Sequence, residues 1–87
     1  MFYVYLLRCK DNSLYCGATA DLARRESLHN SGKGSAYVRS RGGGQIIYTE
    51  RFRSRGKALR REAEIKRWSK AKKEQLAIQV RPGSSHE

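Results

Sequence analysis

Two tyrosines and an arginine recur at a ten-residue step near the N-terminus of the chain: Tyr5, Tyr15 and Arg25. Ten residues is neither a strand period nor a helix period, so one face of a single element does not explain the spacing. A guanidinium binds phosphate oxygens, and phenol hydroxyls can orient a bound group. The placement suggests a site, although the tyrosines could also be ordinary sheet residues and Arg25 a phosphate anchor or a solvated charge.

A carboxylate falls on an otherwise apolar helical stripe further along the chain. Glu62 comes four residues after Ala58 and three before Ile65, which are predicted to face the core. A buried or half-buried charge is costly unless it is paired or binds a metal ion. Glu62 is therefore either one half of an ion pair, with Arg25 as a candidate partner, or a ligand.

A histidine accompanies the arginine on the predicted helix that follows the second tyrosine. His29 lies four residues after Arg25, so the two share a helix face. The ordinary pKa of histidine, ~6.5, makes His29 a candidate general base. The alternative is a histidine that lies on the helix surface or anchors a loop.

The charge of the chain favours a polyanionic partner. The 87 residues include 19 Lys and Arg against 8 Asp and Glu, a net charge of +11, and the excess is concentrated between residues 21 and 61. Such a field attracts nucleic acid through release of counterions, without any base readout. We expect nucleic acid as the partner. A solvated basic surface and an acidic membrane surface are the alternatives.

Length and cysteine content predict one small domain in a reducing compartment. A chain of this size can build a single core. It shows no run of ~20 apolar residues and no leader with a cleavage site, so we expect a cytoplasmic protein without a membrane partner. Cys9 and Cys16 should be reduced, buried, small hydrophobic residues. No C-x-x-C pair indicates zinc.

The pattern predicts an α+β fold, a small three-stranded antiparallel sheet flanked by helices in the order β-β-α-β-α-α. One domain should span 1–80, and a disordered tail 81–87. Thr19 or Asp21 can cap the first helix, Ser54 opens the second and Ser69 can cap the third. The expected elements are strands at 2–9, 14–19 and 45–52, a turn at 10–13, and helices at 22–30, 54–67 and 70–80.

Three features of these elements bear on the site. The 22–30 helix should sit at the sheet edge and present its arginines, because its apolar contact is narrow. The 54–67 helix should bury Ala58, Leu59, Ala63 and Ile65. Residues 31–44 read as a mobile basic loop with a short helical turn around Tyr37, and this loop either binds a phosphate backbone or simply connects.

The ordered set of motifs resembles the GIY-YIG nuclease domain over nearly the whole chain. The resemblance rests on Val4-Tyr5-Leu6, Tyr15-Cys16-Gly17, Asp21-Leu22-x-x-Arg25 and Ala58-Leu59-x-x-Glu62-x-x-Ile65-Lys66. The segment from His29 to Gly34, with Tyr37, further resembles the small stand-alone branch of UPF0213-like proteins. It is also similar to the catalytic domain of structure-specific endonuclease subunits that cut branched DNA.

The resemblance implies a metal-dependent endonuclease that acts on DNA rather than RNA, with branched or nicked DNA as candidate substrates. One Mg²⁺ or Mn²⁺ would be held by Glu62 and waters. Arg25 would clamp the phosphate, Tyr15 would orient it, and Tyr5 would position or deprotonate the attacking water, with His29 as the competing base. A tyrosine base requires its pKa, ordinarily ~10, to fall.

The remaining implications concern binding and the departures from the family pattern. Ala18 stands where excision-repair relatives carry lysine, Gly42-Gly43-Gly44 should make its loop floppier, and Glu74 lies near the place of the repair branch's terminal asparagine. These departures keep open a non-catalytic nucleic-acid-binding module and a subunit that needs a protein partner for targeting. The candidate nucleic-acid-binding residues are Arg24, Lys33, Tyr37, Arg39 and Arg41.

Overall fold

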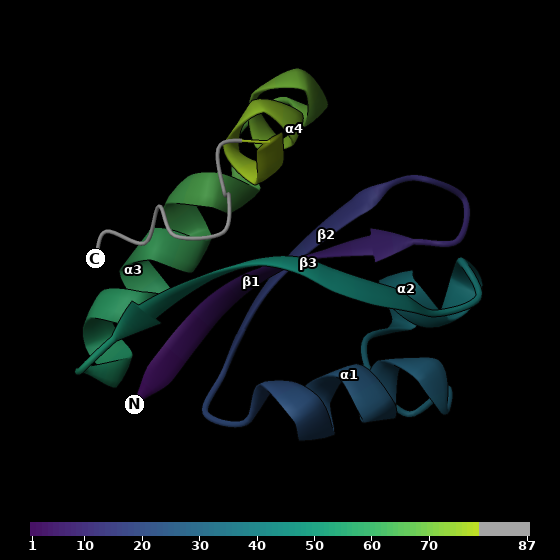
Figure 1. Cartoon of the computed structure of the whole chain (residues 1–87), viewed down its shortest axis with the longest axis horizontal. Helices are drawn as coiled ribbons and strands as arrows, with labels where there is room; N and C mark the ends of the chain where they lie inside the picture. Colours follow the sequence, from purple (N-terminus) through teal and green to yellow (C-terminus); the bar gives the residue numbers. More distant parts are fainter. Residues whose placement is uncertain (79–87) are drawn as a thin grey trace.

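A three-stranded antiparallel sheet with strand order β2-β1-β3 forms the centre of the protein (Figure 1). The structure is a computed structural model and describes residues 1–78. Its strands are β1 (Phe2–Cys9), β2 (Leu14–Thr19) and β3 (Gly44–Phe52), and its helices are α1 (Leu22–Asn30), α2 (Ala36–Ser40), α3 (Arg55–Lys66) and α4 (Lys70–Ile78). The predicted fold class and order are confirmed, and α2 is the short helical turn expected around Tyr37.

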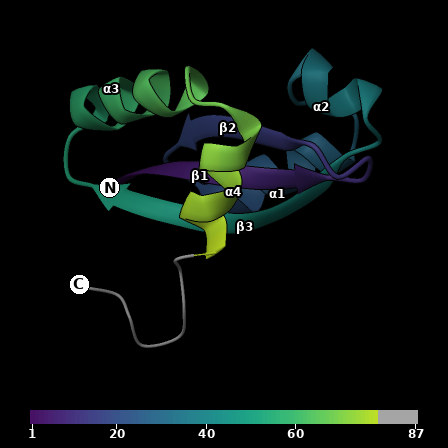
Figure 2. The ribbon, with the colours of Figure 1, turned by 90° about the horizontal axis from the view of Figure 1, so that it is seen from above.

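The central strand β1 is covered on both faces, as its continuous apolar pattern predicted. α3 and α4 lie on one side of the sheet, and α1 and α2 on the other (Figures 1 and 2). The α3 side contains a cluster built on Val4, Leu6, Cys16, Tyr48, Ala58 and Ile65. The other side contains Tyr5, Leu7, Cys9 and Val38. The two free cysteines are buried on opposite faces of the sheet, as small hydrophobic residues.

Helix α1 lies against the face of the sheet and not only at its edge, which corrects the expectation from its narrow apolar stripe. The Asp21 carboxylate caps the helix by accepting a hydrogen bond from the Arg24 backbone N–H at 3.0 Å. The buried residue of α1 is the polar His29. A hydrophobic pattern does not count histidine, so the contact face was wider than the pattern indicated.

Helix α3 buries a narrower stripe than predicted. Ala58 and Ile65 are fully buried, but Leu59 is 42% exposed and Ala63 is also exposed. Each residue turns ~100° around a helix axis, so Leu59, one residue after Ala58, and Ala63, two residues before Ile65, point away from the core. The prediction for Leu59 and Ala63 was therefore wrong, and Leu59 lies on the α3 surface.

The Gly-rich segment before β3 is closely packed, which corrects the expectation of a mobile loop made floppier by its glycines. Gly43 is buried with a φ of +85°, and its N–H donates to the Val38 carbonyl at 3.1 Å. The Asn30 amide donates to the Gly44 carbonyl at 2.8 Å, and its oxygen accepts from the Gly44 N–H at 3.0 Å. These glycines allow close approach and a left-handed turn.

Gly44→Ala should destabilise the protein by about 1–3 kcal/mol or more, because overpacking forces the backbone to move. A Cβ at Gly44 would lie 2.3 Å from the Arg8 carbonyl oxygen and 2.6 Å from Leu7 Cδ2. Gly56→Ala is the matched control: its Cβ would meet only Ser54 Oγ, at 3.9 Å, and alanine favours the α3 helix. Urea denaturation that found Gly44→Ala as stable as the parent would contradict this packing.

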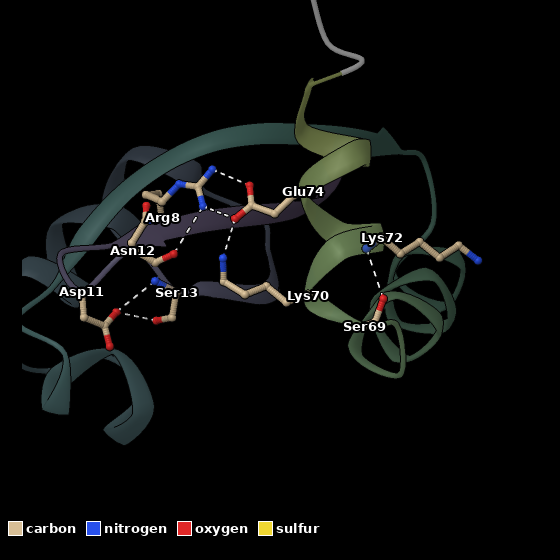
Figure 3. A network of polar contacts seen from close by, with 8 residues as sticks. All are labelled: Arg8, Asp11, Asn12, Ser13, Ser69, Lys70, Lys72 and Glu74. Atoms are coloured by element: carbon tan, nitrogen blue, oxygen red, sulfur yellow. Dashed lines mark hydrogen bonds and ion pairs between the residues drawn. The ribbon is translucent and has the colours of Figure 1, made fainter.

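An ion pair between Arg8 and Glu74 connects helix α4 to the sheet (Figure 3). α4 contains no fully buried residue. Arg8 on β1 donates two hydrogen bonds to the Glu74 carboxylate, one of them 2.7 Å from Nη2 to Oε1. Lys70 Nζ adds a third contact to Glu74, at 2.7 Å. Leu76 packs partly against the core, as predicted. The predictions for residues 79–80 as helix and 81–87 as a disordered tail lie outside the described residues.

Glu74→Gln should loosen α4 in a pH-dependent way. Hydrogen bonds from Arg8, then Lys70, lower the pKa of Glu74 to about 2 from its ordinary value of 4.5. A depressed carboxyl pKa contributes stability that is present above pH ~4.5 and is lost as pH falls toward ~2. The pair is near the surface, so we expect a loss of ~1 kcal/mol or less at pH 7. Denaturation curves for parent and variant should converge by pH ~2; a gap that stays constant with pH would contradict the ion pair.

No helix among residues 1–78 is both long enough and apolar enough to cross a membrane.

Candidate active site

The side chains of Tyr5, Arg25 and His29 meet on the α1 side of the sheet. The Tyr5 hydroxyl lies 2.8 Å from His29 Nε2. Arg25 Nε donates a hydrogen bond to the same hydroxyl at 3.4 Å. Tyr5 comes from the centre of β1 and the other two from α1, where the four-residue spacing puts them on one face. The ten-residue steps therefore lead from β1 to Tyr15 on β2 and then to Arg25 on α1, which returns to the Tyr5 hydroxyl.

Two glycines make room for this cluster. Gly17 pairs with Tyr5 across β1 and β2, and a Cβ there would lie 2.4 Å from the Tyr5 hydroxyl oxygen. A Cβ at Gly34 would lie 2.4 Å from His29 Nδ1. Both contacts are shorter than any ordinary side-chain packing, so each glycine lets the chain close over a ring. Gly17 in the second motif thus has a packing reason that does not depend on any resemblance.

Tyr15 connects the buried cluster with the surface. Its ring centroid lies 6.3 Å from that of Tyr5 and 5.4 Å from that of His29. On the outer side it lies 5.7 Å from the ring of Tyr37, and the Arg41 guanidinium carbon lies 4.0 Å from that ring. An aromatic series therefore runs from the centre of β1 to the exposed surface of α2.

Tyr5 and His29 are both in their neutral forms at pH 7. Burial raises the pKa of Tyr5 to about 12, while the hydrogen bond from Arg25 works in the opposite direction. Burial also lowers the pKa of His29, and the positive charge of Arg25 lowers it further. The fall in the pKa of Tyr5 that a tyrosine base requires is not present in the protein alone. A neutral His29 can instead accept the Tyr5 proton.

Glu62 pairs with Lys66 one turn along α3, and not with Arg25 as the ion-pair expectation had it. Lys66 Nζ lies 3.2 Å from Glu62 Oε2. Arg25 is bound to Tyr5 instead, whereas Lys66 follows Glu62 at the four-residue spacing that favours such pairs. Lys66 Nζ also lies 5.6 Å from the centre of the Tyr15 ring. Glu62 is thereby linked to the aromatic series, and its charge is one of the effects that raise the pKa of Tyr5.

The donor set around Glu62 fits a hard divalent cation with few protein ligands. Among residues 1–78, no group of three or more His, Cys, Asp or Glu side chains could hold a metal ion. Mg²⁺ commonly binds one or two carboxylates and takes its other oxygens from water and substrate phosphate. The Glu62 carboxylate, whose side chain is 18% exposed, can supply one such ligand at the edge of the site.

The predicted nucleic-acid-binding residues fall into two groups. Arg24 on α1, Lys33 in the following turn and Arg39 on α2 are exposed. Tyr37 is 40% exposed but is stacked between Tyr15 and Arg41. The Arg41 Nε lies 3.4 Å from the Asp11 carboxylate, which ties α2 to the β1–β2 turn. The first group can meet a phosphate backbone directly, whereas Tyr37 and Arg41 must first give up contacts within the protein.

Two residues of the cluster were not predicted as site residues. Lys66 is the last residue of a motif and was given no role, although its four-residue distance from Glu62 is typical of a helical ion pair. Gly34 was predicted only as part of the 31–44 loop, and no local pattern indicates that it packs on His29.

Three comparisons place the chain among known proteins. The model of the GIY-YIG catalytic domain matches residues 1–75. A UPF0213 protein from Natronomonas pharaonis is 47% identical over 74 residues, which cover 85% of this chain and 87% of the relative. A UPF0213 protein from Staphylococcus haemolyticus is 46% identical and covers 82% and 87% respectively. The solution NMR structure of a UPF0213 protein from Bacillus halodurans is 48% identical, covers 90% of this chain and 84% of that chain, and superposes with a TM-score of 0.57.

Proposed function

We propose, on the premise that this chain belongs to the GIY-YIG catalytic domain family, that it is a divalent-metal-dependent endonuclease that hydrolyses phosphodiester bonds in DNA. The observation that carries the proposal is the Tyr5 hydroxyl held between Arg25 and His29, beside Tyr15. A phenol, a guanidinium and a neutral imidazole in mutual contact can bind a phosphate and move a proton. A purely structural tyrosine needs neither partner.

Arg25 is the phosphate ligand in this proposal. Its guanidinium donates to Tyr5 through Nε, and the bond is long at 3.4 Å, so its terminal nitrogens can turn to a phosphate. Arginine binds two non-bridging oxygens in a planar fork. Charge that develops on those oxygens during attack is stabilised where the guanidinium is already oriented.

Tyr5 and His29 together form the base. Tyr5 has no exposed surface, so its surroundings must move before water reaches its hydroxyl. The long 3.4 Å hydrogen bond from Arg25 is a contact that can be given up when Arg25 turns toward the phosphate. The Tyr5 oxygen then takes a proton from the attacking water while its own proton passes to His29 Nε2 at 2.8 Å. This transfer does not need a free phenolate, whose formation the pKa of about 12 would make rare at pH 7. Tyr15 orients the phosphate from the outer side.

Glu62 would hold the metal ion, which when bound supplies positive charge for the developing oxyanion and the leaving oxygen. The exposed Arg24, Lys33 and Arg39 would bind the neighbouring backbone phosphates, while Tyr37 and Arg41 would extend the surface. These contacts carry little base information, so sequence specificity should be low. DNA shape, as in branched or nicked substrates, would then decide where the protein cuts.

A panel of nucleic acids tests the proposed function. Supercoiled, linear, nicked and branched DNA, with matched RNA, would be incubated with the protein in EDTA, Mg²⁺ or Mn²⁺. We expect binding in EDTA, cleavage only with a divalent ion, and a preference for branched or nicked DNA. Binding without cleavage under every condition would instead support a nucleic-acid-binding module, and cleavage restored by cell extract would support a subunit that needs a partner.

A further inference from the structure

The Lys66 ammonium forms an ion pair with the one carboxylate that the proposed function assigns to the metal ion. Lys66 Nζ lies 3.2 Å from Glu62 Oε2. Among residues 1–78, Glu62 has no other ion-pair partner. A divalent ion coordinated by the same carboxylate would lie close to this ammonium and be repelled by it. The two cations therefore compete for one site.

The surroundings of the pair favour an exchange over a permanent bond. The Glu62 side chain is 18% exposed, so leaving its charge without a counterion is costly. The Lys66 side chain is 48% exposed, so its ammonium can return to water at little cost. Nζ also lies 5.6 Å from the face of the Tyr15 ring, which attracts a cation without a directional bond.

A second Lys–Glu pair with the same spacing shows what a structural pair looks like in this protein. Lys70 contacts Glu74 at 2.7 Å, but Glu74 is also held by two hydrogen bonds from Arg8. That pair attaches α4 to β1, whereas the Glu62–Lys66 pair joins two residues of the same helix beside the aromatic cluster. Neutralising Glu62 is thus the function left for Lys66.

We propose that Lys66 is the counterion of Glu62 in the free protein. Its ammonium occupies the metal site and leaves when a divalent ion binds. This inference rests on the proposed function, because it takes Glu62 as the metal ligand. Lys66 is a positioning residue: it holds the Glu62 carboxylate through the 3.2 Å ion pair until the metal ion replaces it. Lys66 consequently lowers metal affinity in the absence of DNA.

The test measures Mn²⁺ affinity of the full-length protein without DNA, from the electron spin resonance signal of free Mn²⁺. Lys66→Met should bind Mn²⁺ on the order of tenfold more tightly than the parent, since a repelling charge is removed. Lys66→Arg keeps the cation and should bind like the parent. Lys70→Met is the matched control and should also leave the affinity unchanged. Circular dichroism would check that each variant is folded.

The outcomes separate this inference from the proposed function. If Glu62→Gln binds Mn²⁺ at least tenfold more weakly than the parent but Lys66→Met binds no more tightly, the counterion role is overturned and the metal ligand stands. If Glu62→Gln binds as well as the parent, Glu62 is not the ligand and both proposals fail. Tighter binding by Lys66→Met, with Lys70→Met unchanged, supports the exchange.

Discussion

Tyr5→Phe should cut DNA at least ~100-fold more slowly than the parent while binding it equally well, because it loses the group that passes a proton between water and His29. The ring and its packing against Gly17 are kept, and the hydroxyl is the only loss. The buried His29 Nε2 then has no partner, so stability should fall by ~1–3 kcal/mol. Single-turnover cleavage rates, with DNA affinity measured in EDTA, test this.

Tyr3→Phe is the matched control for that variant, since Tyr3 lies two residues earlier on β1 and is partly exposed. Its cleavage rate should be that of the parent. A rate near that of the parent for Tyr5→Phe, with a large loss for Tyr15→Phe, would show that Tyr15 and not Tyr5 acts on the water. The thermal midpoint of each variant separates slow cleavage from partial unfolding.

Arg25→Ala should lose cleavage to a similar extent, ~100-fold or more, since it removes the group proposed to stabilise the charge on the phosphate. Arg24→Ala is the neighbouring control: Arg24 is exposed, and its side chain points from a different face of α1. It should weaken DNA binding modestly, with a smaller salt dependence, and leave the single-turnover rate of bound DNA unchanged.

Arg25→Lys refines the result, because lysine keeps the charge but cannot form the planar fork. We expect it to recover binding but only part of the rate. Equal rate losses for Arg24→Ala and Arg25→Ala would contradict a specific role for Arg25, and would indicate general attraction between a basic helix and DNA. Arg25→Ala also removes a hydrogen bond to Tyr5, so its stability must be compared with that of Tyr5→Phe.

The architecture could be predicted because local patterns determine it. The two-faced apolar run of β1, the turn at 10–13, the caps at Asp21 and Ser69 and the helix start near Ser54 are all visible as residue types in order. The family could also be predicted, from four short motifs in the right order. Each of these signals is confined to a few neighbouring residues, and none requires knowledge of a distant contact.

The details that were wrong or missed depend on contacts between distant segments. Nothing near Asn30 shows that its amide holds Gly44, so the glycines were interpreted as a source of flexibility. A hydrophobic pattern assigns no burial to His29, although it is fully covered beneath Tyr5. Glu62 pairs with Lys66 and not Arg25 because α3 and α1 lie on opposite sides of the sheet (Figures 1 and 2), which local sequence does not reveal.

Metal-dependent DNA cleavage with Glu62 as the metal ligand is tested by one measurement. This is the single-turnover cleavage rate of a branched DNA in Mn²⁺ for the parent, Glu62→Gln and Glu64→Gln. Glu62 lies beside the aromatic series, whereas Glu64 on the same helix is half-exposed and pairs with Arg61. We expect Glu62→Gln to be at least ~100-fold slower and Glu64→Gln to cut like the parent. Cleavage by Glu62→Gln at the parent rate would contradict this expectation.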